Sequence, residues 1–454
     1  MATKQKQIVM IAYYYHPDLE VGAVRSVKFT KFLPESNWRP IIVTVHTKYY
    51  QRLDPHPLPF ECEVHRTSKW PTQAEIYQWL KSRLRRSSAA ATASGSAPAS
   101  SLDSAAPPVS GRPPIWKRLM SALFWIPDYQ IGWLVPGTWR AIKLVRKYDA
   151  DVLYNSGPPR TGHLMALLAS LATGKPLVVD YRDPLVSLQP PRTLGRKISI
   201  FFERWIERRV LKRAALVITT TPEYRDLLSQ LYHPLLHGKC HSVINGFDAE
   251  DFPQVPEAAP AVNRPIHFLY AGTLYQGRDP RELVVALGAL VREGFLRLSE
   301  IAVDFYGPVE IDPAPLRQII ADSGLSDVIT FRPMVPRRDY LQLIGSADVL
   351  VLLQSETTPV QIPAKAFEYL ATGGEILVMS QPGSTTKLFH QFPNAHIAAP
   401  NDAAEIKERV RAIITRLRSG LGDRRKNLAA LTPLHKRELT KEFAGLLDAL
   451  LERR

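Results

Sequence analysis

The chain has 454 residues, too many for a single hydrophobic core, so we expect two or three domains. Its 45% hydrophobic and 22% charged residues are those of an ordinary globular protein and exclude a mostly disordered chain. The net charge of +15 is concentrated, because residues 66–147 carry 13 Lys/Arg against 3 Asp/Glu and residues 192–213 carry 8 against 2. Such stretches suit an anionic membrane, nucleic acid or phosphorylated ligands, or are simply solvated helix faces.

The N-terminal sequence predicts a β-strand rather than a targeting signal. Its apolar run is short, lacks a small-residue cleavage site and meets His16-Pro17-Asp18 at once. No segment reaches the roughly 18 apolar residues of a membrane span. The two cysteines, Cys62 and Cys240, have no metal or redox spacing, so a reducing compartment is the default. We therefore expect a cytoplasmic protein, with peripheral contact to the inner face of a membrane left open.

The first half of the chain alternates between strand and helix signals. The run KQIVMIAYYY predicts a buried strand, a loop with Gly22 precedes a helix at about 24–33, and RPIIVTV predicts the next strand. Further strands are expected at DVLYNS, PLVVDY, ALVITTT and CHSVIN, with a helix from about His163 and a long one through RKISIFFERWIERRVLKRA. Apolar strands separated by helices are typical of a parallel sheet covered on both faces. We assign residues 1–255 to this Rossmann-like domain.

One segment of this domain breaks the alternation. Residues 87–114 contain 23 Ala, Ser, Pro or Gly out of 28 and cannot bury enough apolar surface to order, so we expect a disordered insert. Residues 115–147 follow, with four of the eight tryptophans among basic residues. Tryptophan with Lys/Arg on a helix is typical of a membrane-facing segment, although these tryptophans could equally belong to an ordinary core.

A second cycle of strands and helices begins near PIHFLYAGTLY. Its expected strands are IAVDFYG, DVITFRP, ADVLVLLQS and EILVMS, and its expected helices lie at about 280–293, 315–323, 336–346 and 363–373. The Pro-rich stretch DFPQVPEAAPAVNRP joins the two halves, so we assign residues 256–430 to a second Rossmann-like domain. An amphipathic helix at about 433–451 dominates the remaining residues 431–454.

Polar clusters follow most of the expected strands, and ligands of doubly wound sheets bind at the carboxyl ends of strands. The clusters are Gly22 with Arg25, SGPPRTGH, DYRDP, AGTLYQGR, YGP and the loop QSETTPVQIPAKAFEYLATG. Glycines before helix starts expose N–H groups that suit phosphate oxygens, and Arg278 and Lys365 add positive charge. The simpler alternatives are a tight turn at Gly272 and a surface position for Arg278.

Other polar residues of these clusters also have two interpretations. Lys365 and Glu368 share a helix face, so they either pair with each other or both contact a ligand. His163 is a candidate catalyst or a buried or capping histidine, and Asp183 beside Arg182 is a site residue or a turn residue. No metal-ligand spacing, Walker loop or nucleophile elbow is present, so we expect no metal and no cofactor.

Several motifs occur together in a specific order and spacing. They are YYYHPDLEVGAVRSVKFTKFLP, SGPPRTGHL, VVDYRDPL, VINGFD, FLYAGTLYQGRDP and IPAKAFEYLATG. Over nearly its whole length the chain thereby resembles a retaining GT-B fold glycosyltransferase of family four. The resemblance implies an α/β protein with two tandem Rossmann-like doubly wound domains facing a cleft. It also implies a nucleotide-sugar donor held mostly by the C-terminal domain without a metal, and an acceptor on the N-terminal domain.

The resemblance assigns expected roles to individual residues. Gly22 would lie against the phosphates from the N-terminal side. Gly272 and Arg278 match the loop that grips the diphosphate, Lys365 would assist it, and Glu368 matches the glutamate that binds the ribose. The resemblance thus favours a shared ligand over a direct pair of Lys365 with Glu368.

Asn245 and Gly246 match the family's turn before the interdomain joint. Three positions depart from the family pattern. Val360 stands where many members carry a second glutamate, Thr273 replaces a common basic residue, and Ser156 replaces the sugar-orienting histidine. Candidates to take over from that histidine are Arg182, Asp183 and His163, which we treat as the expected catalytic residues.

The implied function is transfer of a sugar, with retention of configuration, from a nucleotide-sugar donor to a saccharide or lipid-linked acceptor. Departure of the phosphate then needs stabilisation more than a protein nucleophile. Alternatives are a nucleotide-sugar epimerase of the same fold and a non-catalytic, membrane-associated assembly partner with a decayed site. Nucleic-acid binding is disfavoured because no recognition motif accompanies the basic stretches.

Overall fold

The structure is a computed structural model that describes residues 4–72, 75, 128–184, 194–252, 264–420 and 429–453. It divides into two compact units. The N-terminal unit comprises residues 1–218, 232–240 and 450–454, and the C-terminal unit comprises residues 219–231 and 241–449. The expected insert at 87–114 and the first part of the segment 115–147 lie outside the described residues.

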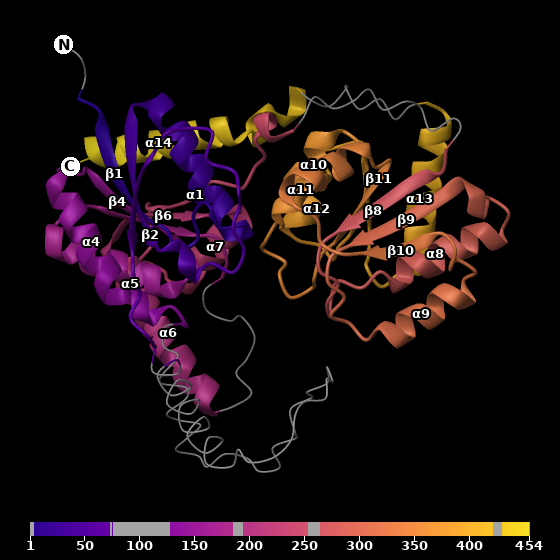
Figure 1. The fold of residues 1–454 in the computed structure, drawn as a ribbon, viewed down its shortest axis with the longest axis horizontal. Helices are drawn as coiled ribbons and strands as arrows, with labels where there is room; N and C mark the ends of the chain where they lie inside the picture. The colour runs from indigo at the N-terminus through magenta and orange to yellow at the C-terminus, as the bar shows by residue number, and fades with distance from the viewer. Residues whose placement is uncertain are drawn as a thin grey trace, which may run out of the picture. The chain divides into compact units, whose positions relative to one another are not determined.

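The first sheet has seven strands (Figure 1). They are β1 (Lys6–Ile11), β2 (Trp38–Val45), β3 (Glu63–Thr67), β4 (Val152–Gly157), β5 (Leu177–Tyr181), β6 (Ala214–Thr219) and β7 (Cys240–Ser242). Their order is β3-β2-β1-β4-β5-β6-β7, and β1 pairs in parallel with both β2 and β4. Strands β4 and β5 are buried along their whole length: their first residues are apolar, and the polar residues Asn155, Ser156 and Asp180 are buried near their carboxyl ends.

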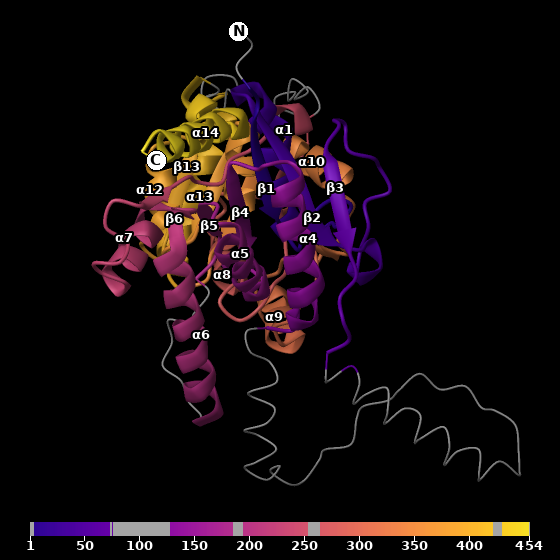
Figure 2. The same cartoon turned by 90° about the vertical axis from the view of Figure 1, so that its left-hand side faces the viewer.

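Helices connect these strands. They are α1 (Val21–Phe32), α4 (Leu134–Lys147), α5 (Arg160–Thr173), α6 (Leu194–Arg213) and α7 (Pro222–Leu231). Helix α5 contacts both α4 and α6, so these three form one layer, seen in front of the strands in Figure 2. Helix α5 ends because Gly174 adopts a left-handed conformation, with φ of 72°, which suits glycine at a helix C-terminus.

Gly22 lies in a helix, not in the loop that the sequence predicted. Helix α1 begins at Val21, three residues before the expected start, with Glu20 in an extended conformation at its N-cap. The loop between β1 and α1 is therefore shorter than predicted. A glycine in the first turn is the reason the start was misplaced, because glycine is a poor helix former.

The second sheet lies in the C-terminal unit and has six strands. They are β8 (Ile266–Ala271), β9 (Ile301–Tyr306), β10 (Ile329–Arg332), β11 (Val349–Leu353), β12 (Glu375–Met379) and β13 (Ala395–Ala398). The order is β10-β9-β8-β11-β12-β13, and each neighbouring pair is parallel. The accompanying helices are α8 (Arg281–Arg292), α9 (Pro313–Asp322), α10 (Arg337–Ser346), α11 (Ala364–Thr372), α12 (Ser384–Phe389), α13 (Ala403–Arg418) and α14 (Lys436–Glu452).

Two hydrophobic cores cover the two faces of this sheet. Val349, Val351 and Leu353 of β11 belong to the core shared with α8, α9 and α13, whereas Leu350 and Leu352 belong to the core shared with α10, α11 and α12. Successive side chains of a strand point to opposite faces, so an unbroken apolar strand supplies both cores at once. The prediction of two tandem doubly wound Rossmann-like domains is confirmed.

The strand order reverses once in each sheet, between β1 and β4 and between β8 and β11. At such a switch point the chain leaves neighbouring strands toward opposite faces, which opens a crevice at their carboxyl ends. The candidate site residues are therefore sought at the ends of these four strands.

Candidate functional site

Lys365 lies at the switch point of the second sheet. It occupies the first turn of α11, and its ammonium donates a hydrogen bond of 2.7 Å to the Ala271 carbonyl at the end of β8. A Cβ added to Gly272 would lie 2.2 Å from Lys365 Nζ, so glycine at 272 is what admits the lysine. Burial, and then the neighbouring Arg278, lower the pKa of Lys365 to about 7. The ammonium thus lies where an anion would stabilise its charge.

Arg278 lies in the loop after β8. Its backbone N–H donates to the Tyr275 carbonyl at 2.7 Å, and its guanidinium carbon lies 4.9 Å from the centroid of the Tyr275 ring. The Nε of Arg278 is buried and has no hydrogen-bond acceptor among the described residues. A buried donor without an acceptor costs free energy, so this atom is one that a bound ligand would satisfy. Thr273, where the family has a basic residue, accepts a 2.9 Å hydrogen bond from the Tyr270 hydroxyl through its carbonyl.

Glu368 is buried one turn further along α11 and is held at both oxygens. Arg337 Nη1 lies 2.6 Å from Oε1, and the Tyr340 hydroxyl donates a 2.6 Å hydrogen bond to Oε2. Both partners lie on α10, three residues apart, and neither was among the residues singled out from the sequence. The direct pair between Lys365 and Glu368 is not formed, since each side chain has a different partner.

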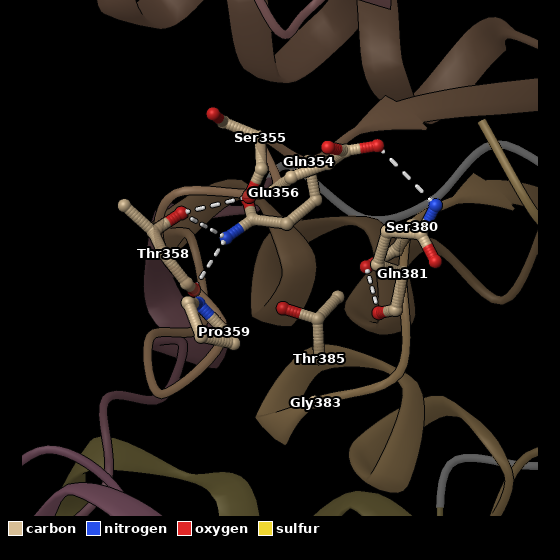
Figure 3. Close-up of a pocket in the computed structure, with 9 residues that line it drawn as sticks. All are labelled: Gln354, Ser355, Glu356, Thr358, Pro359, Ser380, Gln381, Gly383 and Thr385. Atoms are coloured by element: carbon tan, nitrogen blue, oxygen red, sulfur yellow. Dashed lines mark hydrogen bonds between the residues drawn. The ribbon is translucent and has the colours of Figure 1, made fainter. Parts of the chain in front are cut away.

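A small polar pocket lies beyond β11 and β12 in the same unit (Figure 3). It is lined by Gln354, Ser355, Glu356, Thr358, Pro359, Ser380, Gln381, Gly383 and Thr385. Gln354 Nε2 donates to the Thr358 hydroxyl at 2.8 Å, while its Oε1 is buried and unpartnered within the described structure. The cavity volume is about 10 Å³, which is room for about one water molecule, so the pocket as it stands is too small for a sugar. Its outer loop carries Val360, where the family has its second glutamate.

A buried ion pair fixes the corresponding edge of the first sheet. Asp180 at the end of β5 accepts hydrogen bonds from Arg25 Nε at 2.7 Å and Nη2 at 3.1 Å. It also accepts from the Tyr154 hydroxyl at 2.6 Å and from the Ser156 hydroxyl at 3.3 Å. Ser156, which replaces the family's histidine, therefore belongs to a network that connects α1, β4 and β5.

Arg182 links three backbone segments at the same edge. Its guanidinium donates to the carbonyls of Gly22, Gly157 and Pro158, with the last two distances 3.1 and 2.7 Å. A Cβ on Gly22 would lie 2.8 Å from Arg182 Nη1, so the glycine leaves room for the guanidinium. Arg182 thus has a clear structural role, whereas its neighbour Asp183 is exposed.

His163 is 2% exposed and lies below this edge, on α5. Its ring stacks on Tyr181 with centroids 4.7 Å apart, and neither ring nitrogen has a hydrogen-bond partner in the part of the chain that is described. A Cβ on Gly157 would lie 2.1 Å from its Nε2. Burial lowers the pKa of His163 to about 3, so the imidazole is neutral near pH 7.

The predicted site residues fall into two groups. Gly272, Arg278, Lys365 and Glu368 lie after β8 or on α11, within the C-terminal unit. In the N-terminal unit, Gly22, His163, Arg182 and Asp183 lie at or near the ends of β1, β4 and β5. The residues missed from the sequence are Arg337, Tyr340 and the pocket residue Ser380, whereas Gln354 begins a loop that the sequence analysis had singled out. The one available signal for the first two was their spacing of three, which places them on one face of a helix.

Within the described ranges, no group of three His, Cys, Asp or Glu side chains could hold a metal ion. In the same ranges, no helix is long and apolar enough to cross a bilayer.

Asn245 and Gly246 precede residues whose backbone pairs with the chain near Leu434, and a Cβ on Gly246 would lie 2.1 Å from the Leu434 carbonyl.

Comparisons with known proteins point to one class of enzyme. A family model described as "Glycosyl transferase 4-like domain" matches residues 72–235. An alpha-D-kanosaminyltransferase of Streptomyces kanamyceticus is 26% identical over 192 residues, which are 41% of this chain and 48% of that protein. The chain thus matches about half the length of this curated relative.

Solved structures resemble the whole chain. Sucrose-phosphate synthase from Thermosynechococcus elongatus has a TM-score of 0.60 at 16% identity, covering 99% of this chain and 100% of that one. HepE of Anabaena, in complex with UDP and glucose, has a TM-score of 0.60 at 13% identity, covering 98% and 100%. These likenesses show the GT-B fold, and the family model and the curated relative indicate a glycosyltransferase.

Replacing His163 with Phe should flatten the acid side of the stability profile. Because its folded pKa is near 3 against an ordinary 6.5, the unfolded state takes up the proton first as the pH falls. Below pH 6.5 the free energy of unfolding of wild type therefore falls, by about 2 kcal/mol at pH 5, and the variant does not show this fall. Urea unfolding at pH 5 and 7 measures this difference. The control is the exposed residue His237: the His237→Phe variant should lose as much unfolding free energy between pH 7 and pH 5 as wild type does. If His163→Phe also loses as much as wild type, His163 is not the group that destabilises the folded protein at low pH.

Proposed function

We propose that this protein is a glycosyltransferase that moves a sugar from a nucleotide-sugar donor to a saccharide or lipid-linked acceptor, with retention of configuration. The observation that carries the proposal is Lys365, whose pKa is depressed and which lies against Gly272 at the switch point of the second sheet. The family model at 72–235 and the glycosyltransferase relatives support the same class.

The donor diphosphate is assigned to Lys365 and Arg278. Burial, and after it the positive charge of Arg278, lowers the pKa of Lys365, and a bound diphosphate would offset both effects. Arg278 Nε offers an unused donor, and the N-terminal N–H groups of α11 favour an anion by about 0.3 to 1 kcal/mol. With this much positive charge from the chain itself, we expect the diphosphate to bind without a metal.

Glu368 is assigned to the ribose hydroxyls of the donor. Arg337 and Tyr340 each engage one of its oxygens and hold the carboxylate in one orientation. A carboxylate oxygen has two acceptor sites, so each can still accept a hydrogen bond from a ribose hydroxyl. Arg337 and Tyr340 then act as positioning residues, because they affect the ligand through Glu368.

The reaction needs a stabilised leaving group more than a nucleophile. The bond between the anomeric carbon and the phosphate oxygen breaks, an acceptor oxygen bonds to that carbon on the same face, and the acceptor's proton passes to the departing phosphate. Lys365 and Arg278 stabilise the charge that develops on the diphosphate.

Asp183 is the preferred candidate for contact with sugar or acceptor in the N-terminal unit. Of the three residues expected to replace the sugar-orienting histidine, it is the exposed one, whereas His163 is buried and Arg182 binds three backbone carbonyls.

We place the protein in the cytoplasm, where nucleotide sugars are made, and expect polysaccharide or glycolipid synthesis as its process. The epimerase and the non-catalytic alternatives find no support among the proteins that the chain resembles.

Lys365→Ala should weaken the binding of nucleoside diphosphates by at least about tenfold, since a charge-assisted contact is worth roughly 1.5 to 3 kcal/mol. Isothermal calorimetry with UDP, GDP and ADP would identify the base and measure the loss. Lys407→Ala, which removes a partly buried lysine paired with Glu293, is the matched control and should bind like wild type. If no nucleoside diphosphate binds wild type, or if Lys365→Ala binds as tightly, the proposed function is wrong.

Nucleoside diphosphate binding should weaken as the pH rises above 7. Lys365 is protonated in the free protein only below its pKa of about 7, and a bound diphosphate raises that pKa, so binding above pH 7 takes up a proton. The affinity should then fall by about tenfold per pH unit between pH 7.5 and 9. Lys365→Arg keeps its charge and should show a flat profile. Equal pH dependence in both proteins would exclude Lys365 as the titrating group.

Tyr340→Phe should separate ribose recognition from diphosphate recognition. Loss of the hydroxyl that holds Glu368 should weaken UDP or the preferred nucleotide by about three- to tenfold. Inorganic pyrophosphate, which has no ribose, should bind to the variant and to wild type alike. A parallel loss for both ligands in competition calorimetry would mean that the substitution disturbs the whole site.

A further inference from the structure

Helix α6 has its carboxylates inside and its aromatic side chains outside, the reverse of an ordinary surface helix. Glu203 and Glu207, the two acidic residues of α6, are both buried. Phe201 is 66% exposed and Trp205 is 50% exposed, and Phe202 is exposed beside them. Large aromatic side chains in water are unfavourable, so this arrangement needs an explanation outside the helix's own packing.

The buried carboxylates are paired inside the N-terminal unit. Glu203 Oε1 lies 2.6 Å from Arg196 Nη1 and accepts a 2.7 Å hydrogen bond from the Ser199 hydroxyl, and its Oε2 lies 3.3 Å from Arg160 Nη2. Glu207 accepts a hydrogen bond from the Tyr232 hydroxyl. These contacts fix the rotation of α6, so the outward position of its aromatic residues is a built feature of the fold.

The outward face carries positive charge and no negative charge. We define this face by the exposed residues of α6, which are Lys197, Phe201, Phe202, Arg204, Trp205, Arg208, Arg209 and Lys212. Since both acids point inward, no carboxylate of the described part of α6 offsets the five bases. The Arg209 guanidinium carbon lies 4.9 Å from the centroid of the Trp205 ring, so aromatic and basic groups form one surface.

Helix α4, in the same layer as α6, repeats the pattern. Trp139 is 55% exposed, and the Lys143 ammonium lies 3.5 Å from the centroid of its ring. Trp133, from the same basic segment, is instead fully buried and donates a 2.7 Å hydrogen bond to the Thr67 hydroxyl. The tryptophans of the segment 115–147 that are described thus divide between core and surface.

The aromatic part of α6 lies toward the ligand-binding edge of the first sheet. Helix α6 runs directly into β6, so it starts near the carboxyl ends of the strands. Its 20 residues span about 30 Å, whereas the six residues of β6 span about 20 Å. The N-terminal end of the helix therefore extends past the strands, as Figure 2 shows, and Phe201 belongs to the N-terminal half of this helix.

We propose that the outward face of α6 binds the surface of an anionic lipid bilayer. Its aromatic rings enter the interfacial region while its bases contact lipid phosphates, the combination that holds interfacial helices on membranes. Bases near an anionic surface contribute about 1 kcal/mol each, which makes charge complementarity the reason to prefer a bilayer over an uncharged partner. This proposal goes beyond the transfer reaction and places the acceptor edge of the N-terminal unit at the membrane.

Vesicle co-sedimentation of the full chain tests this proposal. Wild type should bind vesicles of phosphatidylcholine with 30% phosphatidylglycerol, weakly bind phosphatidylcholine alone, and lose binding at high salt. Phe201→Ser with Phe202→Ser, and separately Lys197→Glu with Lys212→Glu, should each reduce partitioning by at least about tenfold. All four residues are exposed, so the melting temperature should not change.

Matched controls come from the C-terminal unit. Arg292→Glu with Arg317→Glu makes the same change in net charge at exposed sites, and Leu231→Ser removes an equally exposed apolar residue. Both controls should bind vesicles like wild type. The affinity for nucleoside diphosphates, measured by calorimetry, should be the same in every variant. A failure of the membrane proposal can therefore be told apart from a failure of the proposed function.

Two results would overturn the proposal. One is equal vesicle binding by wild type and both α6 variants, or none by wild type. The other is a dimer in light scattering that Phe201→Ser with Phe202→Ser dissociates, which would assign the outward face to a second copy of the chain.

Discussion

The contact between the Lys365 ammonium and the Ala271 carbonyl is the interaction on which the candidate donor site depends. It joins the first turn of α11 to the end of β8 across the point where the strand order reverses. The contact exists because position 272 has no side chain, and its charge is costly because Arg278 and burial both act against it. A site that holds unfavourable positive charge in the free state is prepared for an anion, since the energy spent on its assembly is returned when the anion arrives.

The fold was predictable because its signals are local and repeated. A fully buried strand such as β11 is apolar at every position, and amphipathic helices alternate with such strands. The start of α1 was missed by three residues because Gly22 is a weak helix former. Its real constraint is the guanidinium of Arg182, which comes from a strand more than a hundred residues away and leaves no trace in the local pattern.

The candidate site was only partly predictable for a similar reason. A charged residue at a helix start after a strand, such as Lys365, can be singled out from its position alone. The partners of Glu368 could not be singled out in this way. Arg337 and Tyr340 look like an ordinary polar helix face in the sequence, and their role appears only when the fold brings α10 against α11. In the first sheet, Arg25 and Asp180 lie far apart in the sequence, and their pairing in a dry interior is a property of the assembled sheet.

The inward carboxylates of α6 also bear on how this helix finds its orientation. The inward face of α6 also buries Ile200, Val210 and Leu211, so apolar burial and polar pairing favour the same rotation of the helix. The polar partners add a place for two carboxylates inside the unit, Arg160 and Arg196 for Glu203 and Tyr232 for Glu207. A relative that lacked Arg160 and Tyr232 would have no reason to keep glutamates on the inward face of this helix.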